Sequence, residues 1–168
     1  MNKRAEALAQ RIEQGARMLA EYAQGLNEHE WNTVVAPDRR TVGVMVHHVA
    51  SVYEIEIRLA TQIANGNPVK GVTWEVIAQM NAHHAHENAA PGKQETIELL
   101  RRNSQAAAAS VRAFTDEQLD RAATVSLNAD APLTAQFMIE DHAVRHSWHH
   151  MAKIKAVLGN RAMAAAMN

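Results

Sequence analysis

The stretch LTAQFMIEDHAVRHSWHHMAKIKAVL, residues 133–158, decides the fold class, because its apolar side chains recur with the 3.6-residue period of an α-helix. The face that carries this period runs through Ile139, Ala143, His146, His150, Ile154 and Val157. Asp130 is expected to cap this helix and Pro132 to lie in its first turn, while Gly159 and Asn160 are expected to end it. The sequence therefore predicts one long final helix.

The same period recurs in the rest of the chain. It predicts long helices over residues 3–26, 41–64 and 97–114, and a weaker helix over residues 73–89. A short helix should follow the capping box of Thr115 and Gln118, and residues 122–131 should form a polar loop. No stretch sustains the period of two that is typical of β-strands. We therefore expect an all-α, single-domain protein over residues 1–168, a four-helix bundle with one additional shorter helix between its second and third long helices.

The net charge and the absence of cysteine exclude several classes of function. Seventeen basic and eighteen acidic residues give a formal net charge of −1, so no basic field would steer the protein to nucleic acid. The absence of Cys excludes disulfides, a thiolate zinc site and a cysteine nucleophile. No apolar stretch is long enough to span a membrane. Charged residues near the N-terminus interrupt any hydrophobic run of the length found in signal peptides. We expect a cytoplasmic protein that binds neither nucleic acid nor a membrane.

The ten histidines are the main sign of chemistry in this sequence. In the helix over residues 41–64, His48 lies on the apolar face, whereas His47 is rotated toward solvent or a loop. In the last helix, His146 and His150 are four residues apart, so they lie one turn apart within the apolar face. Three inward imidazoles without partners would each cost about 1–3 kcal/mol. One divalent ion would satisfy all three.

An isolated inward His is more often a core residue with a hydrogen-bond partner. Three of them, two at ligand spacing, favour a metal site formed by His48, His146 and His150. With no Cys and no clustered Asp, such a site suits Zn²⁺, Ni²⁺ or Fe²⁺ better than Mg²⁺ or Ca²⁺. Coordination positions would remain open for water or substrate.

Other polar groups on these helices are expected to lie outside the set of three histidines. His142 and His149 lie at the edge of the apolar face, where they either orient a ligand or transfer protons, or simply meet water. Glu54 and Glu56 are expected to be solvated helix charges beside Arg58.

The segment between the second and third long helices carries a further histidine cluster. His83, His84 and His86 share no single helical face, so a solvated patch or the rim of a pocket is expected there rather than a second metal site. Trp74 in the same segment is expected to pack in the core, and Trp31 in the preceding connection is expected to be buried.

The ordered histidines resemble a known family. His48 within HHVA, followed by His146-x-x-x-His150 in the last helix, resembles the pattern of the DinB-like metalloprotein family. The superfamily includes the mycothiol-dependent maleylpyruvate isomerase and bacillithiol transferase proteins. EHEWNTVVAPDRRTVGVMVHHVA (28–50) resembles the family's first connection and second helix, and VTWEVIAQMNAHHAHENAA (72–90) its segment between helices 2 and 3. The resemblance implies a four-helix bundle that binds a divalent metal, often as a homodimer, and activates a low-molecular-weight thiol.

Two functions from different classes follow as hypotheses. One is a metal-dependent enzyme of thiol S-transferase or related hydrolase type, acting on a small-molecule substrate with a thiol as cosubstrate. In such an enzyme the ion lowers the pKa of a bound thiol or water. The alternative is a non-catalytic metal-binding protein that acts in a stress response or recognises a partner. No catalytic residue is assigned from the sequence.

The last helix has a second apolar side. This side carries Phe137, Val144, Trp148 and Met151. Only one face of each helix in a bundle meets the core, so this side must be covered by the connection over residues 27–40, by the helix over 73–89, or by another subunit. Because two-fold dimers are the commonest soluble oligomers, we expect a homodimer.

Overall fold

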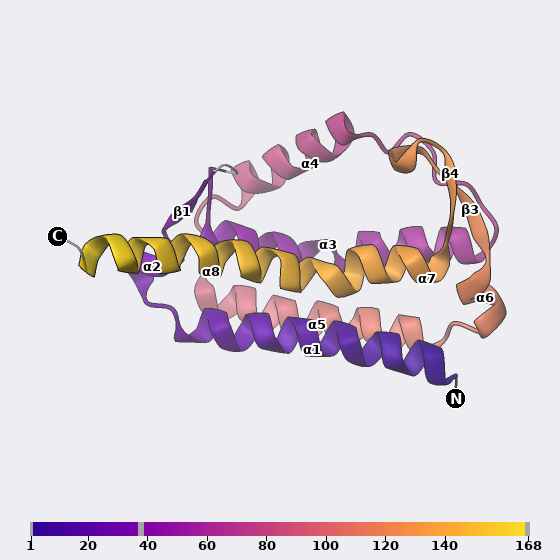
Figure 1. The fold of residues 1–168 in the computed structure, drawn as a ribbon, viewed down its shortest axis with the longest axis horizontal. Coiled ribbons are helices and arrows are strands. Elements are labelled where there is room, and N and C mark those ends of the chain that lie inside the picture. The colour runs from indigo at the N-terminus through magenta and orange to yellow at the C-terminus, as the bar shows by residue number, and fades with distance from the viewer. Residues whose placement is uncertain (1, 37–38, 167–168) are drawn as a thin grey trace.

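Four long amphipathic helices each bury one apolar stripe, and these stripes meet in one core. The computed structural model, which describes residues 2–36 and 39–166, arranges them as a four-helix bundle (Figure 1). The helices are α1 (Lys3–Gly25), α3 (Val42–Ala64), α5 (Lys93–Arg112) and a last rod of α7 (Ala135–Met138), a π segment (Ile139–Val144) and α8 (Arg145–Ala166). A shorter helix, α4 (Trp74–Glu87), lies between α3 and α5 in the chain. The predicted fold class is confirmed.

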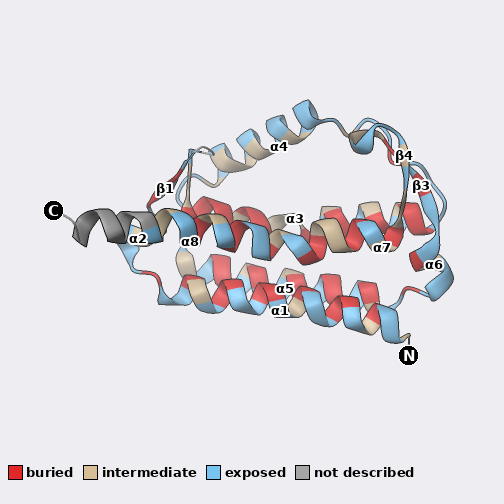
Figure 2. Cartoon of the chain, viewed as in Figure 1, coloured by how far each residue is buried: buried red, intermediate tan, exposed pale blue. Residues whose placement is uncertain are grey.

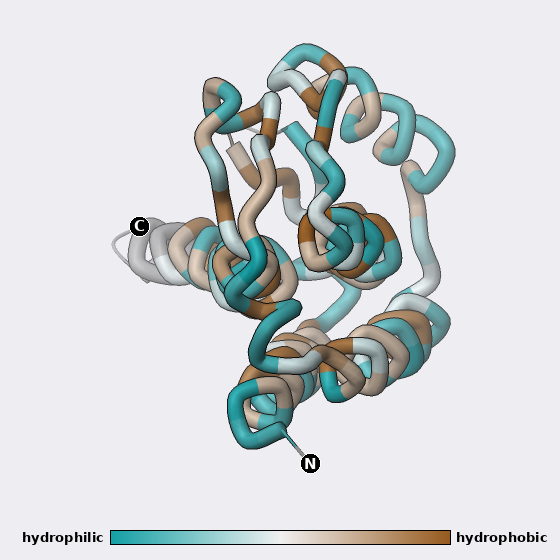
Figure 3. Tube along the Cα trace, turned by 90° about the vertical axis from the view of Figure 1, so that its right-hand side faces the viewer, coloured by the Kyte–Doolittle hydropathy of each residue, from teal (hydrophilic) through white to brown (hydrophobic). Residues whose placement is uncertain are grey.

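The order of the helices explains why the chain needs α4. Helix α5 packs against both α1 and α3, and the last rod closes the bundle beside α1 and α3. Because α3 and α5 run in the same direction, α4 must return the chain from one end of the bundle to the other (Figure 1). Viewed nearly end-on, the four long helices form the bundle and α4 lies outside it (Figure 3).

Several helix starts agree with the sequence. Thr41 caps α3, its side chain accepting a hydrogen bond from the backbone N–H of Val44 at 3.2 Å. Thr115 and Gln118 form the predicted capping box before α6 (Asp116–Asp120). These caps are local hydrogen bonds between residues three apart, which is why sequence alone can locate them.

A single-turn helix that the sequence does not predict, α2 (Glu28–Trp31), buries Trp31 as expected. The indole N–H of Trp31 donates to the backbone carbonyl of Pro91 at 3.0 Å. Its ring packs directly on α3, where a Cβ at Gly43 would come within 2.6 Å of it. Trp31 therefore ties the first connection to α3 and to the loop before α5, close to the turn that carries the first candidate histidines.

Two short antiparallel ribbons lie at the ends of the bundle. They are β1 (Val34–Val35) with β2 (Arg40–Thr41), and β3 (Ala122–Val125) with β4 (Ala131–Thr134). The predicted polar loop over residues 122–131 is therefore wrong. Ala123 and Val125 are buried while their neighbours in β3 are exposed, and an alternation of four residues is too short to stand out in the sequence.

The last helical rod also differs from the prediction at both ends. Asp130 has a φ of 58° ahead of β4 and does not cap the helix. Thr134 does so instead, accepting a hydrogen bond from the backbone N–H of Phe137 at 3.1 Å. Helix α8 runs through the predicted stop at residues 159–160 and ends at Ala166. One Gly costs a helix only about 1 kcal/mol, so it does not have to end one.

Helix α4 contributes nothing to the core. It has no buried residue (Figure 2), and Trp74 at its start is 72 % exposed. The expectation that Trp74 packs in the core is therefore wrong. The helical period of this segment is real, but its apolar residues do not reach the interior that the four long helices enclose.

The second apolar side of the last rod is partly covered within the chain. Val144 and Met151 are buried, whereas Phe137 and Trp148 are 43 % and 37 % exposed. Trp148 lies against α1, since a Cβ at Gly15 would be 3.0 Å from its Nε1. The homodimer stays a prediction that these exposed side chains allow. Among the helices described, none combines the length and the apolar character needed to cross a membrane.

Candidate metal centre

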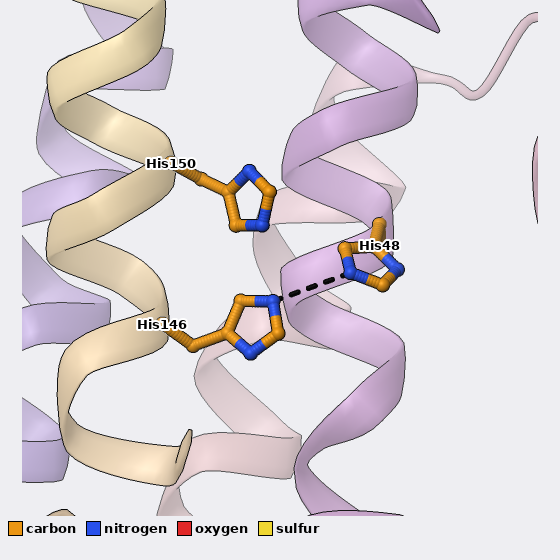
Figure 4. Close-up of side chains that lie close together, drawn as sticks. All are labelled: His48, His146 and His150. Carbon is orange, nitrogen blue, oxygen red and sulfur yellow. Dashed lines mark hydrogen bonds between the residues drawn. The ribbon is translucent and has the colours of Figure 1, made fainter. Parts of the chain in front are cut away.

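Three histidines from two helices converge between α3 and α8 (Figure 4). His48 extends from α3, and His146 and His150 extend toward it from α8. One nitrogen of each ring lies within 4.8 Å of the other two. The Nε2 atoms of His48 and His146 are 3.2 Å apart, and the rings of His146 and His150 are stacked with centroids 4.8 Å apart. The structure thus brings together the three residues selected from the sequence, which we call the histidine triad.

The packing of α8 against α3 sets the positions of the triad. His150 is only 6 % exposed, and Ser147 beside it is completely buried. The hydroxyls of Ser147 and Tyr53, a buried residue of α3, form a hydrogen bond with an O···O distance of 2.8 Å. His146 lies at the edge of the same face, with 19 % of its side chain exposed. A buried hydrogen bond thus holds the two helices together at the level of the triad.

The π segment Ile139–Val144 ends directly before the triad residues of α8. A π turn adds one residue to the helix, which rotates the faces on its two sides by about 100° relative to each other. An angular count based on one continuous α-helix therefore holds within α8 but not across this segment. Such π segments are frequent at functional sites.

Glu56 is a residue of the site that the sequence does not single out. It was expected to be solvated, but it is 5 % exposed, and its Oε1 lies 2.5 Å from Nδ1 of His146. Eight residues after His48, its side chain is turned by about 80° around α3, which directs it to α8 rather than to water. Glu54, by contrast, is exposed as predicted. The only local signal for Glu56 is its position between apolar neighbours.

The carboxylate of Glu56 determines which nitrogen of His146 can bind another group. A carboxylate only accepts hydrogen bonds, so the N–H of His146 must be at Nδ1. The Nε2 of His146, which faces His48, then keeps its lone pair. Carboxylates commonly orient metal-binding histidines in this way. The arrangement therefore suits a histidine whose Nε2 binds a cation.

The other two triad residues are held neutral. Burial, and then the neighbouring imidazole of His146, lower the pKa of His48 to about 2. The same two causes lower the pKa of His150. Nδ1 of His150 and Oε2 of Glu56 are buried without a hydrogen-bond partner among the described residues. Buried polar atoms normally have partners, so neutral rings with unmet capacity fit a site that receives a metal ion.

These lowered pKa values predict that the metal-free protein loses stability as the pH falls below about 6.5. In the unfolded chain His48 and His150 take up protons near that pH, whereas in the folded chain they stay neutral. Each such group costs about 1.4 kcal/mol of unfolding free energy per pH unit. Urea unfolding of metal-free protein between about pH 7 and pH 5 measures this slope. A His150→Gln variant should show a shallower slope, and an equal slope would contradict the assignment.

His47 and His84 form a second pair beside the triad. Nδ1 of His47 lies 2.9 Å from Nε2 of His84, so His47 faces α4 rather than open solvent. The ring of His84 also meets the ring of His48 edge-on, with centroids 5.5 Å apart. Burial, followed by the nearby His47, lowers the pKa of His84 to about 4. Of the cluster in α4, His84 thus lies at the rim of the site.

The remaining candidate histidines lie outside the triad. His83 and His86 are exposed, as expected for a solvated patch. His142 is half-buried with its Nε2 3.8 Å from the carboxylate of Asp141. His149 is exposed and touches the ring of His150 edge-on, with centroids 5.2 Å apart. Neither His142 nor His149 belongs to the group of nitrogens that face one another.

Comparisons with known proteins agree with this architecture. A family model described as the DinB superfamily matches residues 11–154. The chain is also similar to a solved structure of YfiT from Bacillus subtilis, described as a probable metal-dependent hydrolase with an unusual four-helix bundle topology. The two share 17 % identity at a TM-score of 0.73, over 95 % of this chain and 90 % of that chain. At this identity the likeness concerns the fold alone. No curated protein matches the chain.

Proposed function

The chain belongs to the DinB superfamily, and from this premise we propose that it binds one divalent transition metal ion through the histidine triad and uses it in a thiol-transfer or hydrolysis reaction. The observation that carries the proposal is the convergence of three imidazole nitrogens, one of them oriented by a buried carboxylate. An all-nitrogen donor set favours Zn²⁺, Ni²⁺ or Fe²⁺ over Mg²⁺ or Ca²⁺.

The number of donors favours a catalytic over a structural ion. Among the described residues, no fourth His, Asp or Glu joins the three histidines. Structural zinc sites are closed by four protein ligands, whereas catalytic sites keep a position open. A bound ion with an open position lowers the pKa of a thiol or water molecule and so supplies a nucleophile at neutral pH.

The chain's own residues have defined tasks in this proposal. Glu56 accepts a hydrogen bond from the Nδ1–H of His146 and so keeps the Nε2 lone pair of His146 directed at the site. Burial keeps His48 and His150 in the neutral form that can bind a cation. YfiT is described as a probable metal-dependent hydrolase, and this description supports the hydrolytic form of the proposal. The proposal that a thiol is the cosubstrate rests on the family resemblance.

Metal analysis of protein purified without an affinity tag tests the proposal. After incubation with Zn²⁺ or Ni²⁺ and removal of excess, we expect about one ion per chain. The ion should be retained below pH 6.5, because the lowered pKa values of His48 and His150 keep protons from competing at these two nitrogens. Less than about 0.2 ion per chain would overturn the metal site.

Catalysis is tested separately on the loaded protein. Metal-loaded protein should accelerate either the reaction of L-cysteine with 1-chloro-2,4-dinitrobenzene or the hydrolysis of 4-nitrophenyl acetate, and metal-free protein should accelerate neither. The first result would identify thiol transfer and the second hydrolysis. Full metal content with no acceleration of a broad set of thiol and ester substrates would favour the non-catalytic alternative.

A further inference from the structure

A pocket of about 410 Å³ opens where the first turns of α5 meet α3 and the loop that follows α4. Its wall includes His47 of α3 and, at the start of α5, Gly92, Thr96, Glu98, Leu99 and Arg102. We call it the α5 pocket. Its volume is typical of small-molecule sites. None of its lining residues belongs to the histidine triad. On α3 the pocket is lined by His47, whereas the triad contains the next residue, His48.

Two opposite charges in the wall of the α5 pocket do not neutralise each other. Glu98 and Arg102 are four residues apart on α5, the spacing at which Glu followed by a basic residue usually forms an ion pair. No ion pair joins them, and the guanidinium of Arg102 has no partner within the described residues. Glu98 only accepts a neutral hydrogen bond from the amide of Gln94 at 3.0 Å. Both side chains are exposed, so the solvent-facing side of the pocket offers a cation without a partner among the described residues and an anion with only a neutral one.

Glu95 is the third charged residue in the wall of the α5 pocket, and it already has a structural role. The carboxylate of Glu95 lies over Gly92, where a Cβ would overlap it. Gly92 is the N-cap of α5 and provides no side chain to cap the helix. The negative charge of Glu95 is thus matched by the positive end of the helix dipole. This assigns Glu98, not Glu95, as the anion that remains for a ligand.

Two further polar groups in the wall have unused capacity. Thr96 is 1 % exposed, and its buried Oγ1 has no hydrogen-bond partner among the described residues. His47 uses Nδ1 in contacts with His84 and Ser51, and its Nε2 makes no hydrogen bond within the described residues. Buried hydroxyls of natural proteins are rarely left without a partner. Leu99 and Pro91 complete the wall with apolar surface.

We propose that the α5 pocket binds a small zwitterion with an ammonium group and a carboxylate on one carbon, as in an α-amino acid. The ammonium group donates to Glu98, and the carboxylate accepts from Arg102. An apolar remainder packs against Leu99 and Pro91. The proposal goes beyond the metal-dependent function and does not depend on it, because every residue involved lies outside the triad.

The test is a titration of metal-free, ¹⁵N-labelled protein with three matched probes, followed by two-dimensional NMR. L-Norvaline carries both charges, butylamine has lost the carboxylate, and pentanoate has lost the ammonium group. Norvaline should shift the amide signals of Thr96 and Leu99 with a dissociation constant of about 1 mM, and the other two probes should bind at least about tenfold more weakly. Using metal-free protein keeps this result independent of the triad.

Single substitutions with a matched control complete the test. Arg102→Gln and Glu98→Gln should each weaken norvaline binding about tenfold, because each removes one charge-assisted contact. Arg101→Gln removes an adjacent exposed cation that does not line the pocket, and it should leave binding within about twofold. Equal binding of the three probes, no saturable shift up to about fifty times the expected constant, or an equal effect of Arg101→Gln and Arg102→Gln would each overturn the proposal.

Discussion

Replacing His150 by Ala is expected to weaken the binding of Zn²⁺ or Ni²⁺ by at least about 100-fold. A zinc site with four protein ligands contributes roughly 10–16 kcal/mol, or about 2.5–4 kcal/mol per ligand. That loss corresponds to a factor of about 100 to 1000 in affinity. His146→Ala and His48→Ala should have effects of the same size, because all three nitrogens belong to one group. Competition with a coloured chelator measures the affinity directly.

Matched controls come from the histidines next to the triad. His149 is the neighbour of His150 and is exposed, and His47 is the neighbour of His48 and faces α4. His149→Ala and His47→Ala should therefore keep the metal with affinity within about threefold, and circular dichroism should show that all variants remain helical. If His47→Ala removed the ion and His48→Ala did not, the assignment of α3 would be wrong.

Replacing Glu56 by Gln should lower metal affinity by about 10- to 100-fold, even though Glu56 is not a member of the triad. The Gln side chain can still accept the Nδ1–H of His146, but without charge, so the hydrogen bond is weaker and the Nε2 of His146 becomes a poorer donor. The same chelator competition measures the change. Glu56→Ala should lower the metal affinity further, because it leaves His146 without an orienting partner.

Glu54→Gln is the control for this prediction. Glu54 lies on the same helix two residues earlier and is exposed. If Glu56 were a solvated charge, as its position in the sequence suggests, both substitutions would leave the affinity unchanged. Equal affinities of the Glu54→Gln and Glu56→Gln proteins would therefore contradict the role that the structure assigns to Glu56.

The fold and the triad could be predicted because both depend on the period of the α-helix. Within α8, Ile154 and Val157 continue the apolar face of His146 and His150, and this period holds whatever the face packs against. His48 was separated from His47 by the same angular reasoning, and the structure buries the first and leaves the second at the rim. The caps at Thr41 and Thr115 are equally local.

The errors have a common origin in contacts between different elements. Trp74 lies on a helix of normal period, but α4 crosses outside the bundle, so the residue stays exposed. The β3–β4 ribbon depends on pairing across a turn, and neither strand is long enough to be recognised alone. The π segment shifts the helical phase without a signal that a fixed angle of 100° can detect.

The sequence by itself determined that the chain is a helical bundle with three inward histidines, because helical period and capping are properties of neighbouring residues. Only the tertiary structure decided that Glu56 meets His146, that His47 meets His84, and that Glu98 and Arg102 line a pocket without pairing. Each of these depends on how far one helix is rotated and shifted against another. That rotation is set by the packing of the whole core, to which residues far apart in the chain contribute.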